Sequence, residues 1–168
     1  MMLNTALEYR TAYLLLGGNL GKREDNLQQA IKLISSKIGE VESISSVYET
    51  AAWGKTDQPS FLNQAVAVKT NLQPLAILHE ALEIEHTLGR IRDVKWGERL
   101  IDIDLILIGS EVINIADQLQ VPHPHMQHRR FVMAPLAEIA PGVFHPVLKK
   151  TIKEILENIT DKLDVKKL

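Results

Sequence analysis

The chain has 168 residues, a length that fits one domain with a buried core. Apolar residues make up 45% and charged residues 24% of the sequence, which is ordinary for a soluble globular protein. The net charge of −2 gives no general attraction to nucleic acid or an anionic membrane, and the absence of cysteine excludes disulfides and thiolate metal sites.

The N-terminal residues lack the features of a targeting signal. Residues 1–10 contain Glu8 and no apolar core of signal-peptide length. The longest apolar runs of the chain are far too short to span a bilayer. We therefore expect a soluble cytoplasmic protein with one domain over residues 1–168, of which residues 1–10 form a loose leader.

The first half of the chain predicts three strands and a helix. A strand over residues 12–16 ends at a Gly-Gly-Asn turn. The helix over residues 24–38 ends at Gly39, where a C′ glycine belongs. Its buried stripe has apolar residues at helical spacing: Leu27, Ile31, Ile34 and Ile38. Residues 41–50 and 61–70 are rich in β-formers, and the ten-residue loop between them is long for a hairpin.

The second half predicts another helix and a buried strand. Pro74 opens a helix that runs to about Leu88, with Gly89 behind it. The strand over residues 102–108 is apolar on both faces after its aspartates, which indicates a central, covered position. The other expected elements are a small edge strand over 112–113, an irregular segment over 121–130, a helix over 132–139, and a helix from the Thr151 capping box to about residue 159.

The order of these elements predicts the fold class. Strands and helices follow one another as β-α-β-β-α-β, and a C-terminal helical extension comes after them. This is the ferredoxin-like order, an α+β fold in which the helices pack on one face of an antiparallel sheet.

Asp102 and Asp104 are the first candidate site. Residues i and i+2 of a strand point to the same face, about 7 Å apart, so that two carboxylates can share one or two Mg²⁺ ions. A solvated strand end is the alternative. The apolar residues around the pair argue against it, because two aspartates in a buried strand repel each other unless a cation neutralises them.

A basic segment precedes the aspartates. Arg90, Arg92 and Arg99 surround one loop that also holds Trp96. A single surface arginine is usually only solvated, whereas several around one loop favour the binding of phosphate, which arginine grips bidentately. Carboxylates beside arginines are the parts of a phosphoryl- or diphosphoryl-transfer site.

Three other segments give less specific indications of function. Phe61 and Asn63 share one strand face and could stack on and hydrogen-bond a flat heterocycle, with ordinary core packing as the alternative. The spacing of His123, His125 and His128 fits no strong zinc pattern, and a histidine that hydrogen-bonds phosphate, with Arg129 nearby, is the better interpretation. Residues 17–22 fail as a P-loop, because Leu16 and Arg23 stand at two of its required positions.

Several short motifs in a fixed order resemble the 6-hydroxymethyl-7,8-dihydropterin pyrophosphokinase family. The resemblance runs from about Tyr13 to Pro141. Its motifs are Gly-Gly-Asn at 17–19, Tyr-Glu-Thr at 48–50, Gln-Pro-Ser-Phe-Leu-Asn at 58–63, Gly-Arg-Ile-Arg at 89–92, the stretch from Lys95 to Asp104, Val-Pro-His-Pro at 121–124, and Arg129 with Phe131.

The resemblance implies an activity and a set of site residues. The enzyme would transfer the β,γ-diphosphate of ATP to the hydroxymethyl oxygen of 6-hydroxymethyl-7,8-dihydropterin in tetrahydrofolate biosynthesis, as a monomer that releases AMP. The implied roles are two Mg²⁺ ions on Asp102 and Asp104, catalysis by Arg90 and Arg99, ATP binding by Arg92, Trp96, His123 and Arg129, and pterin binding by Thr50, Phe61, Asn63 and Phe131.

Two other functions are compatible with parts of the pattern. Another Asp-x-Asp metal-dependent nucleotide transferase would use the same carboxylates, but such enzymes usually need a larger nucleotide-binding domain. A ferredoxin-like ligand-binding or regulatory module without catalysis would not need two strand aspartates beside three arginines. The nucleotide product of the reaction separates these possibilities.

Overall fold

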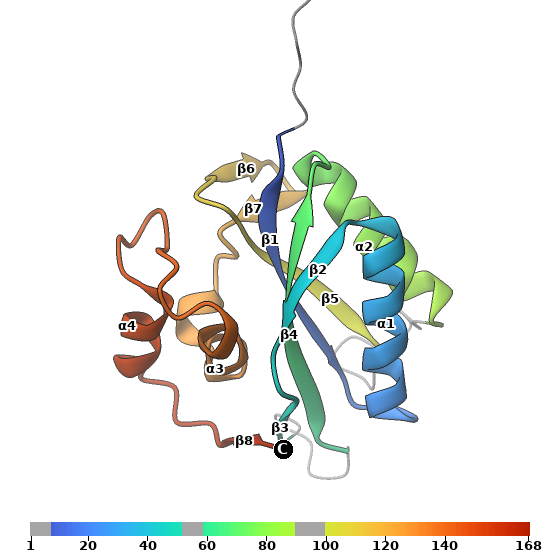
Figure 1. Cartoon of the computed structure of the whole chain (residues 1–168). Coiled ribbons are helices and arrows are strands. Elements are labelled where there is room, and N and C mark those ends of the chain that lie inside the picture. The colour runs from blue at the N-terminus through green and yellow to red at the C-terminus, as the bar shows by residue number, and fades with distance from the viewer. Residues whose placement is uncertain (1–7, 52–58, 90–99) are drawn as a thin grey trace, which may run out of the picture.

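The computed structural model of the chain describes residues 8–51, 59–89 and 100–168. Its centre is a six-stranded antiparallel sheet in the order β5-β1-β4-β3-β8, with β2 also paired to β4 (Figure 1). The strands are β1 (Arg10–Gly18), β2 (Glu40–Ile44), β3 (Tyr48–Thr50), β4 (Phe61–Thr70), β5 (Asp102–Ile108) and β8 (Val165–Lys167).

The pairing of β1 with β4 is the longest in the sheet. It runs from Arg10 opposite Thr70 to Gly18 opposite Leu62 without a register shift. Both strands are buried on both faces over most of their length, which explains why their sequences are nearly continuous apolar runs. The predicted strands over residues 12–16 and 61–70 are thereby confirmed.

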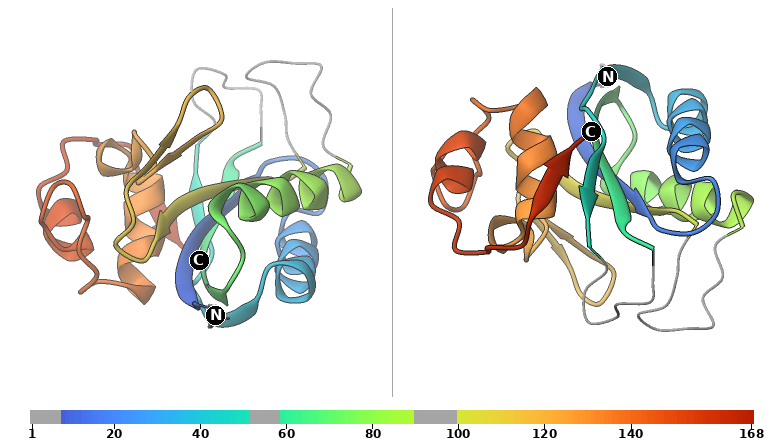
Figure 2. Two further views of the ribbon diagram at one scale, coloured as in Figure 1. Left: turned by 90° about the horizontal axis from the view of Figure 1, so that it is seen from above. Right: turned by 90° about the horizontal axis from the view of Figure 1, so that it is seen from below.

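Helices α1 (Arg23–Lys37) and α2 (Pro74–Thr87) cover one face of the sheet (Figures 1 and 2). The predicted stripe of α1 is confirmed with one change, because Ala30 is fully buried where Ile31 is only half-buried. Burying one isoleucine of this stripe, such as Ile34, contributes roughly 1.5–3 kcal/mol as an upper estimate. None of the helices in the described parts of the chain has the length and apolarity of a membrane span.

The C-terminal extension covers the other face of the sheet. Helices α3 (Arg130–Ile139) and α4 (Ile152–Glu157) enclose a second apolar cluster, which includes Leu15, Ile106 and Met133 (Figure 2). The predicted capping box at Thr151 is present, and its helix ends two residues earlier than expected. The architecture is therefore the expected ferredoxin-like α+β fold with a C-terminal helical extension.

Strand β5 is covered as predicted, but its expected central position is wrong. It ends the order of strands and pairs only with β1 in the described sheet. Its residues reach both apolar clusters, since Leu105 belongs to one and Ile106 to the other. Apolarity on both faces reports what lies above and below a strand, not what lies beside it. A hairpin of β6 (Ile113–Ile115) and β7 (Leu119–Val121) replaces the expected edge strand over residues 112–113.

Three further expectations about the strands need correction. The predicted strand over residues 41–50 is broken at Ser45, whose hydroxyl accepts a hydrogen bond from the Ala65 N–H and replaces a ladder bond. Arg10, which we expected in a loose leader, is the first residue of β1. Strand β8 was not expected, because its sequence is charged and only three residues long.

We expected Gly39 to be the C′ glycine that ends α1, but the structure shows a different reason for a glycine at this position. Its backbone is not left-handed, whereas that of Gly89 behind α2 is, with φ of +87°. A Cβ atom at position 39 would instead collide with the backbone carbonyl oxygen of Lys69 in β4. The glycine is therefore required by the close approach of the α1 end to the sheet.

We predict that Gly39→Ala destabilises the protein by about 2 kcal/mol or more, because backbone atoms must move to accept the methyl group. Gly142→Ala is the matched control, since a Cβ atom there meets nothing within 4 Å, and it should change stability by less than about 0.5 kcal/mol. Urea unfolding of both variants tests this. Equal stability of the two variants would contradict the close approach.

Candidate active site

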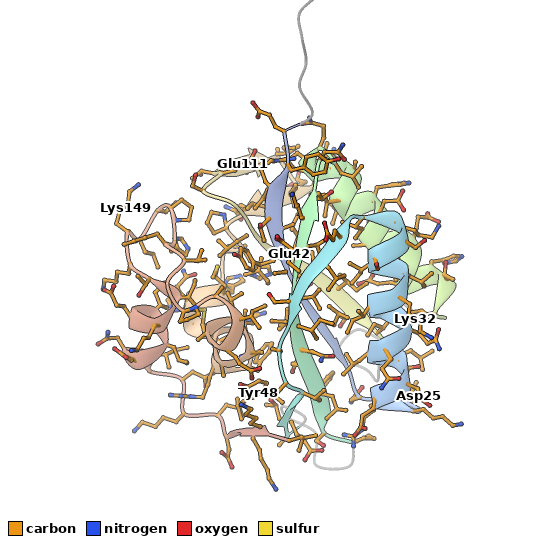
Figure 3. All side chains as sticks on the ribbon, in the orientation of Figure 1. Asp25, Lys32, Glu42, Tyr48, Glu111 and Lys149 are labelled. Atoms are coloured by element: carbon orange, nitrogen blue, oxygen red, sulfur yellow. The ribbon has the colours of Figure 1, made fainter. Side chains whose placement is uncertain are left out.

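The register of the sheet aligns four site positions in one row. Asp102 is opposite Gly17, Gly17 is opposite Asn63, and Asn63 is opposite Tyr48. Paired residues of antiparallel strands point to the same face of a sheet. This face is the one that α3 covers, because the Tyr48 hydroxyl donates to Glu138 of α3 at 2.7 Å. Figure 3 shows Tyr48 on that side of β3. These four residues are called the site row below.

Asp102 and Asp104 lie on the α3 face as the strand period predicts. Asp102 is half-buried and Asp104 is exposed, while Ile103 between them is buried in the cluster on the helical face formed by α1 and α2. No group of three or more histidine, aspartate or glutamate side chains in the described ranges could hold a metal ion. Two carboxylates nevertheless fit Mg²⁺, which is commonly held by one or two carboxylates together with substrate phosphates.

Glu85 of α2 secures the strand between the two aspartates. Its side chain is buried, with 3% exposure, and its Oε2 accepts a hydrogen bond from the Ile103 N–H at 2.7 Å. We expected no role for this residue from the sequence. The available signal was a glutamate directly after Ile84 in a helix that otherwise buries apolar residues. A buried carboxylate needs such a partner, because leaving it unpaired costs much more than the bond contributes.

Gly17 leaves room for the amide of Asn63. We expected this glycine in a turn, but it lies within β1. A Cβ atom at position 17 would stand 2.5 Å from Asn63 Nδ2, and that amide donates to the Leu16 carbonyl at 3.4 Å. Asn63 therefore extends over the backbone of β1 in the direction of Asp102.

The residues expected to hold a flat ring lie on the same face. Thr50 is the cross-strand partner of Phe61, two positions from the site row. Phe61 is half-buried and Thr50 is 4% exposed. The Thr50 hydroxyl has no hydrogen-bond partner among the described residues, which is unusual for a buried polar atom. Phe131 is the second residue of α3. Among the described residues, no ring contact joins Phe131 to Phe61.

His123 is held as a neutral hydrogen-bond donor. Its backbone N–H bonds the Ile106 carbonyl at 2.9 Å, which attaches the segment after the cis Val121–Pro122 peptide to β5. Burial, followed by the charges of Arg129 and His125, lowers the pKa of His123 to about 4. Its Nδ1 accepts from the His125 N–H at 3.2 Å, so the neutral ring carries its hydrogen on Nε2.

Arg129 and Phe131 lie together at the start of α3. The guanidinium carbon of Arg129 is 5.8 Å from the centre of the Phe131 ring. Asp161 fixes this end of the helix, because its carboxylate accepts from the Arg130 and Leu163 N–H groups, both at 2.9 Å. These hydrogen bonds lower the pKa of the Asp161 carboxyl, although burial acts in the opposite direction. The cap is contributed by the tail, where no sequence pattern indicated it.

Tyr48 attaches the site row to α3. Burial, followed by its hydrogen bond to Glu138, raises the pKa of the Tyr48 phenol. Burial also raises the pKa of the Glu138 carboxyl, but hydrogen bonds from Tyr48 and Ser46 outweigh it and lower the pKa overall. Lys167 of β8 adds a cation 3.6 Å from Glu138 Oε1. The pair is thus a protonated phenol donating to an ionised carboxylate.

The structure brings together only part of the expected site. Asp102, Asp104, Thr50, Phe61 and Asn63 share one face of the sheet. His123, Arg129 and Phe131 belong to the segment that runs from β5 into α3. The remaining expected residues lie outside the described residues: Arg90, Arg92, Trp96 and Arg99.

Comparisons with known proteins agree on one family. A sequence model described as 7,8-dihydro-6-hydroxymethylpterin-pyrophosphokinase matches residues 13–141. The 2-amino-4-hydroxy-6-hydroxymethyldihydropteridine pyrophosphokinase of Bacillus subtilis is 47% identical over 79% of this chain and 79% of its own length. The protein of the same name from Aquifex aeolicus is 43% identical over 86% of this chain and 89% of its own.

Solved structures resemble the fold. An HPPK-DHPS triple mutant of Plasmodium falciparum with SDX-DHP superposes with a TM-score of 0.75 at 20% identity, over 92% of this chain and 45% of that one. The wild-type HPPK-DHPS of Plasmodium falciparum with pterin and p-hydroxybenzoate superposes with a TM-score of 0.72 at 19% sequence identity. The match covers 92% of this chain and 44% of that one. The chain thus spans less than half the length of these proteins, and at this identity the likeness concerns the fold alone.

We predict that His123 remains neutral from pH 8 to about pH 5, with its hydrogen on Nε2, because its pKa is about 4. Nitrogen chemical shifts of the imidazole, followed through a pH titration, measure both properties. As the pH falls below about 6.5, the unfolded chain takes up this proton first. The contribution of His123 to stability is therefore complete above that pH and declines toward pH 4. A midpoint near 6.5, or a hydrogen on Nδ1, would contradict the arrangement.

Proposed function

Because this chain belongs to the 7,8-dihydro-6-hydroxymethylpterin-pyrophosphokinase family, we propose that it transfers a diphosphate from ATP to 6-hydroxymethyl-7,8-dihydropterin in tetrahydrofolate biosynthesis. The hydroxymethyl oxygen forms a bond to the β-phosphorus. The bond from that phosphorus to the oxygen bridging it to the α-phosphorus breaks, and this oxygen leaves on AMP. The hydroxyl proton goes to solvent, and the pterin diphosphate is the second product.

The observation that carries this proposal is the site row. It places Asp102, a candidate metal ligand, on the same sheet face as Asn63, a candidate contact for a flat ring, with only Gly17 between them. Such a transfer depends mainly on holding the two reactants in line and on neutralising charge, with little covalent work for the protein. A rigid sheet that presents both sets of residues meets that requirement.

Asp102 and Asp104 would hold two Mg²⁺ ions, whose charge neutralises the phosphates when they are bound. Around them, the neutral His123 would donate its Nε2 hydrogen to a phosphate oxygen, and Arg129 would contribute a permanent charge. On sequence grounds, Arg92 and Trp96 would complete the ATP site. Arg90 and Arg99 would stabilise the charge that moves during transfer.

Phe61 and Phe131 would stack on the two faces of the pterin. Asn63 and Thr50 would bond the edge of the heterocycle. The buried hydroxyl of Thr50, which has no hydrogen-bond partner among the described residues, supports this role, because a bound ring would satisfy it. We further propose that the chain acts as a monomer in the cytoplasm.

A product assay tests the reaction. The purified chain is mixed with MgATP and 6-hydroxymethyl-7,8-dihydropterin, and the nucleotides are separated. We expect AMP and the pterin diphosphate in equal amounts, and no AMP without the pterin or with excess chelator. Formation of ADP would indicate a different transferase. Binding of both ligands without turnover would indicate a module without catalysis.

We predict that Asp102→Asn and Asp104→Asn each lower kcat by about 100-fold or more, because each replaces an anionic ligand of the Mg²⁺ ions that would neutralise the transferred group. Asp164→Asn is the matched control, since Asp164 is exposed near the C-terminus, and its rate should be unchanged. Initial rates at saturating MgATP measure the effect. Near-normal rates in either strand variant would remove that aspartate from the metal site.

A further inference from the structure

A cluster of three polar side chains lies at the start of α1, beside the expected pterin contacts. Arg23 Nη1 donates to the Ser60 carbonyl at 2.8 Å, to Ser60 Oγ at 3.0 Å and to Glu49 Oε2 at 3.3 Å. Ser60 Oγ in turn donates to the same Glu49 oxygen at 2.9 Å. The three residues therefore form a closed triangle, called the Arg23 clamp below. None of them had a role assigned from the sequence.

The clamp holds the residues next to two proposed pterin contacts. Glu49 directly precedes Thr50, Ser60 directly precedes Phe61, and Thr50 pairs with Phe61 across the strands. Side chains alternate along a strand, so Glu49 points to the α1 face while Thr50 points to the α3 face. The clamp thus fixes both strands from behind, without touching the face on which the pterin would bind.

Two further features stiffen this corner of the sheet. Asn19, which is 1% exposed, donates to the Pro59 carbonyl at 3.2 Å, so the chain entering β4 is attached to the end of β1 as well as to α1. The hydrogen bond from Ser60 lowers the pKa of the Glu49 carboxyl. Burial acts in the opposite direction, but the contact with Arg23 also lowers this pKa, so that the overall shift is downward. The clamp therefore joins an ionised carboxylate to a permanent cation, and such hydrogen bonds are stronger than neutral ones.

We propose that Arg23 is a positioning residue for the pterin: it acts through Ser60 and Glu49 to hold Phe61 and Thr50 at the spacing that the ring requires. This inference rests on the proposed function. It predicts selectivity, because the metal-binding aspartates are on β5, separated from β4 by β1. Losing the clamp should weaken pterin binding and leave nucleotide binding nearly unchanged.

Arg10 provides a matched control. Its Nε donates to Glu111 Oε2 at 2.9 Å and its Nη1 to the Leu72 carbonyl at 2.9 Å, so it also links a carboxylate and a backbone oxygen. The exposed fraction of its side chain is 18%, against 29% for Arg23. Arg10 begins β1, and Figure 3 shows Glu111 at the opposite end of the sheet from Tyr48. Arg10→Ala thus removes a similar tie away from the site.

The experiment compares the full-length protein with Arg23→Ala, Arg23→Lys and Arg10→Ala. Pterin fluorescence gives the Kd for 6-hydroxymethyl-7,8-dihydropterin, calorimetry gives the Kd for a non-hydrolysable MgATP analogue, and thermal unfolding gives Tm. We expect Arg23→Ala to raise the pterin Kd about tenfold and the nucleotide Kd less than about twofold. Arg23→Lys should recover part of the loss, since lysine keeps the charge but not the fork. Arg10→Ala should lower Tm without changing either Kd.

Three results would overturn the role of Arg23. They are an unchanged pterin Kd in Arg23→Ala, an equal rise of the pterin Kd and the nucleotide Kd in that variant, or a rise of the pterin Kd in Arg10→Ala as large as that in Arg23→Ala. If Arg23→Ala does not fold, Ser60→Ala replaces it, because it removes only the hydroxyl of the clamp. The proposal then requires a pterin-selective loss of about two- to threefold, and no loss would overturn it. Failure of the unaltered protein to bind pterin at all would instead refute the proposed function.

Discussion

The unshifted pairing of β1 with β4 is the constraint on which the rest of the structure depends. Because this ladder keeps one register from Arg10 to Gly18, the position of Gly17 determines what lies on either side of it. One neighbour is Asp102 and the other is Asn63. A slip of one residue would turn these side chains to the opposite face, and would also remove the apolar residues of both strands from their clusters. Core packing and the alignment of Gly17 with Asn63 are therefore specified by the same pairing, while the separate pairing of β1 with β5 places Asp102.

The two faces of the sheet have different tasks. The face under α1 and α2 supplies most of the apolar burial, and it also carries polar ties that hold the strands from behind, such as those of Glu85 and Arg23. The face toward α3 presents the polar row, and Glu138 and Asp161 attach α3 and the C-terminal tail beside it. Rigid support on one face lets the other present polar groups that contribute little to folding.

The sequence predicted the elements whose residues repeat at a regular spacing, and it predicted the face that Asp102 shares with Asp104. It did not predict the edge position of β5, because burial above and below a strand says nothing about its lateral neighbours. It also missed Glu85 and Arg23. Each bonds a backbone group far away in the chain, and such a contact leaves no periodic signal in the local sequence. The resemblance to the family implied roles for residues that spacing alone left ambiguous, and these roles stay predictions.

The central claim, that one row of the sheet joins the metal-binding and ring-binding halves of the site, can be tested by paramagnetic broadening. With Mn²⁺ and a non-hydrolysable ATP analogue bound, the side-chain amide of Asn63 should broaden strongly, since two strand spacings place it only about 10 Å from the backbone of Asp102. Thr70, at the far end of β4 and about 24 Å from Asn63 along the strand, should remain sharp. An unbroadened Asn63 signal with the nucleotide bound would contradict the account.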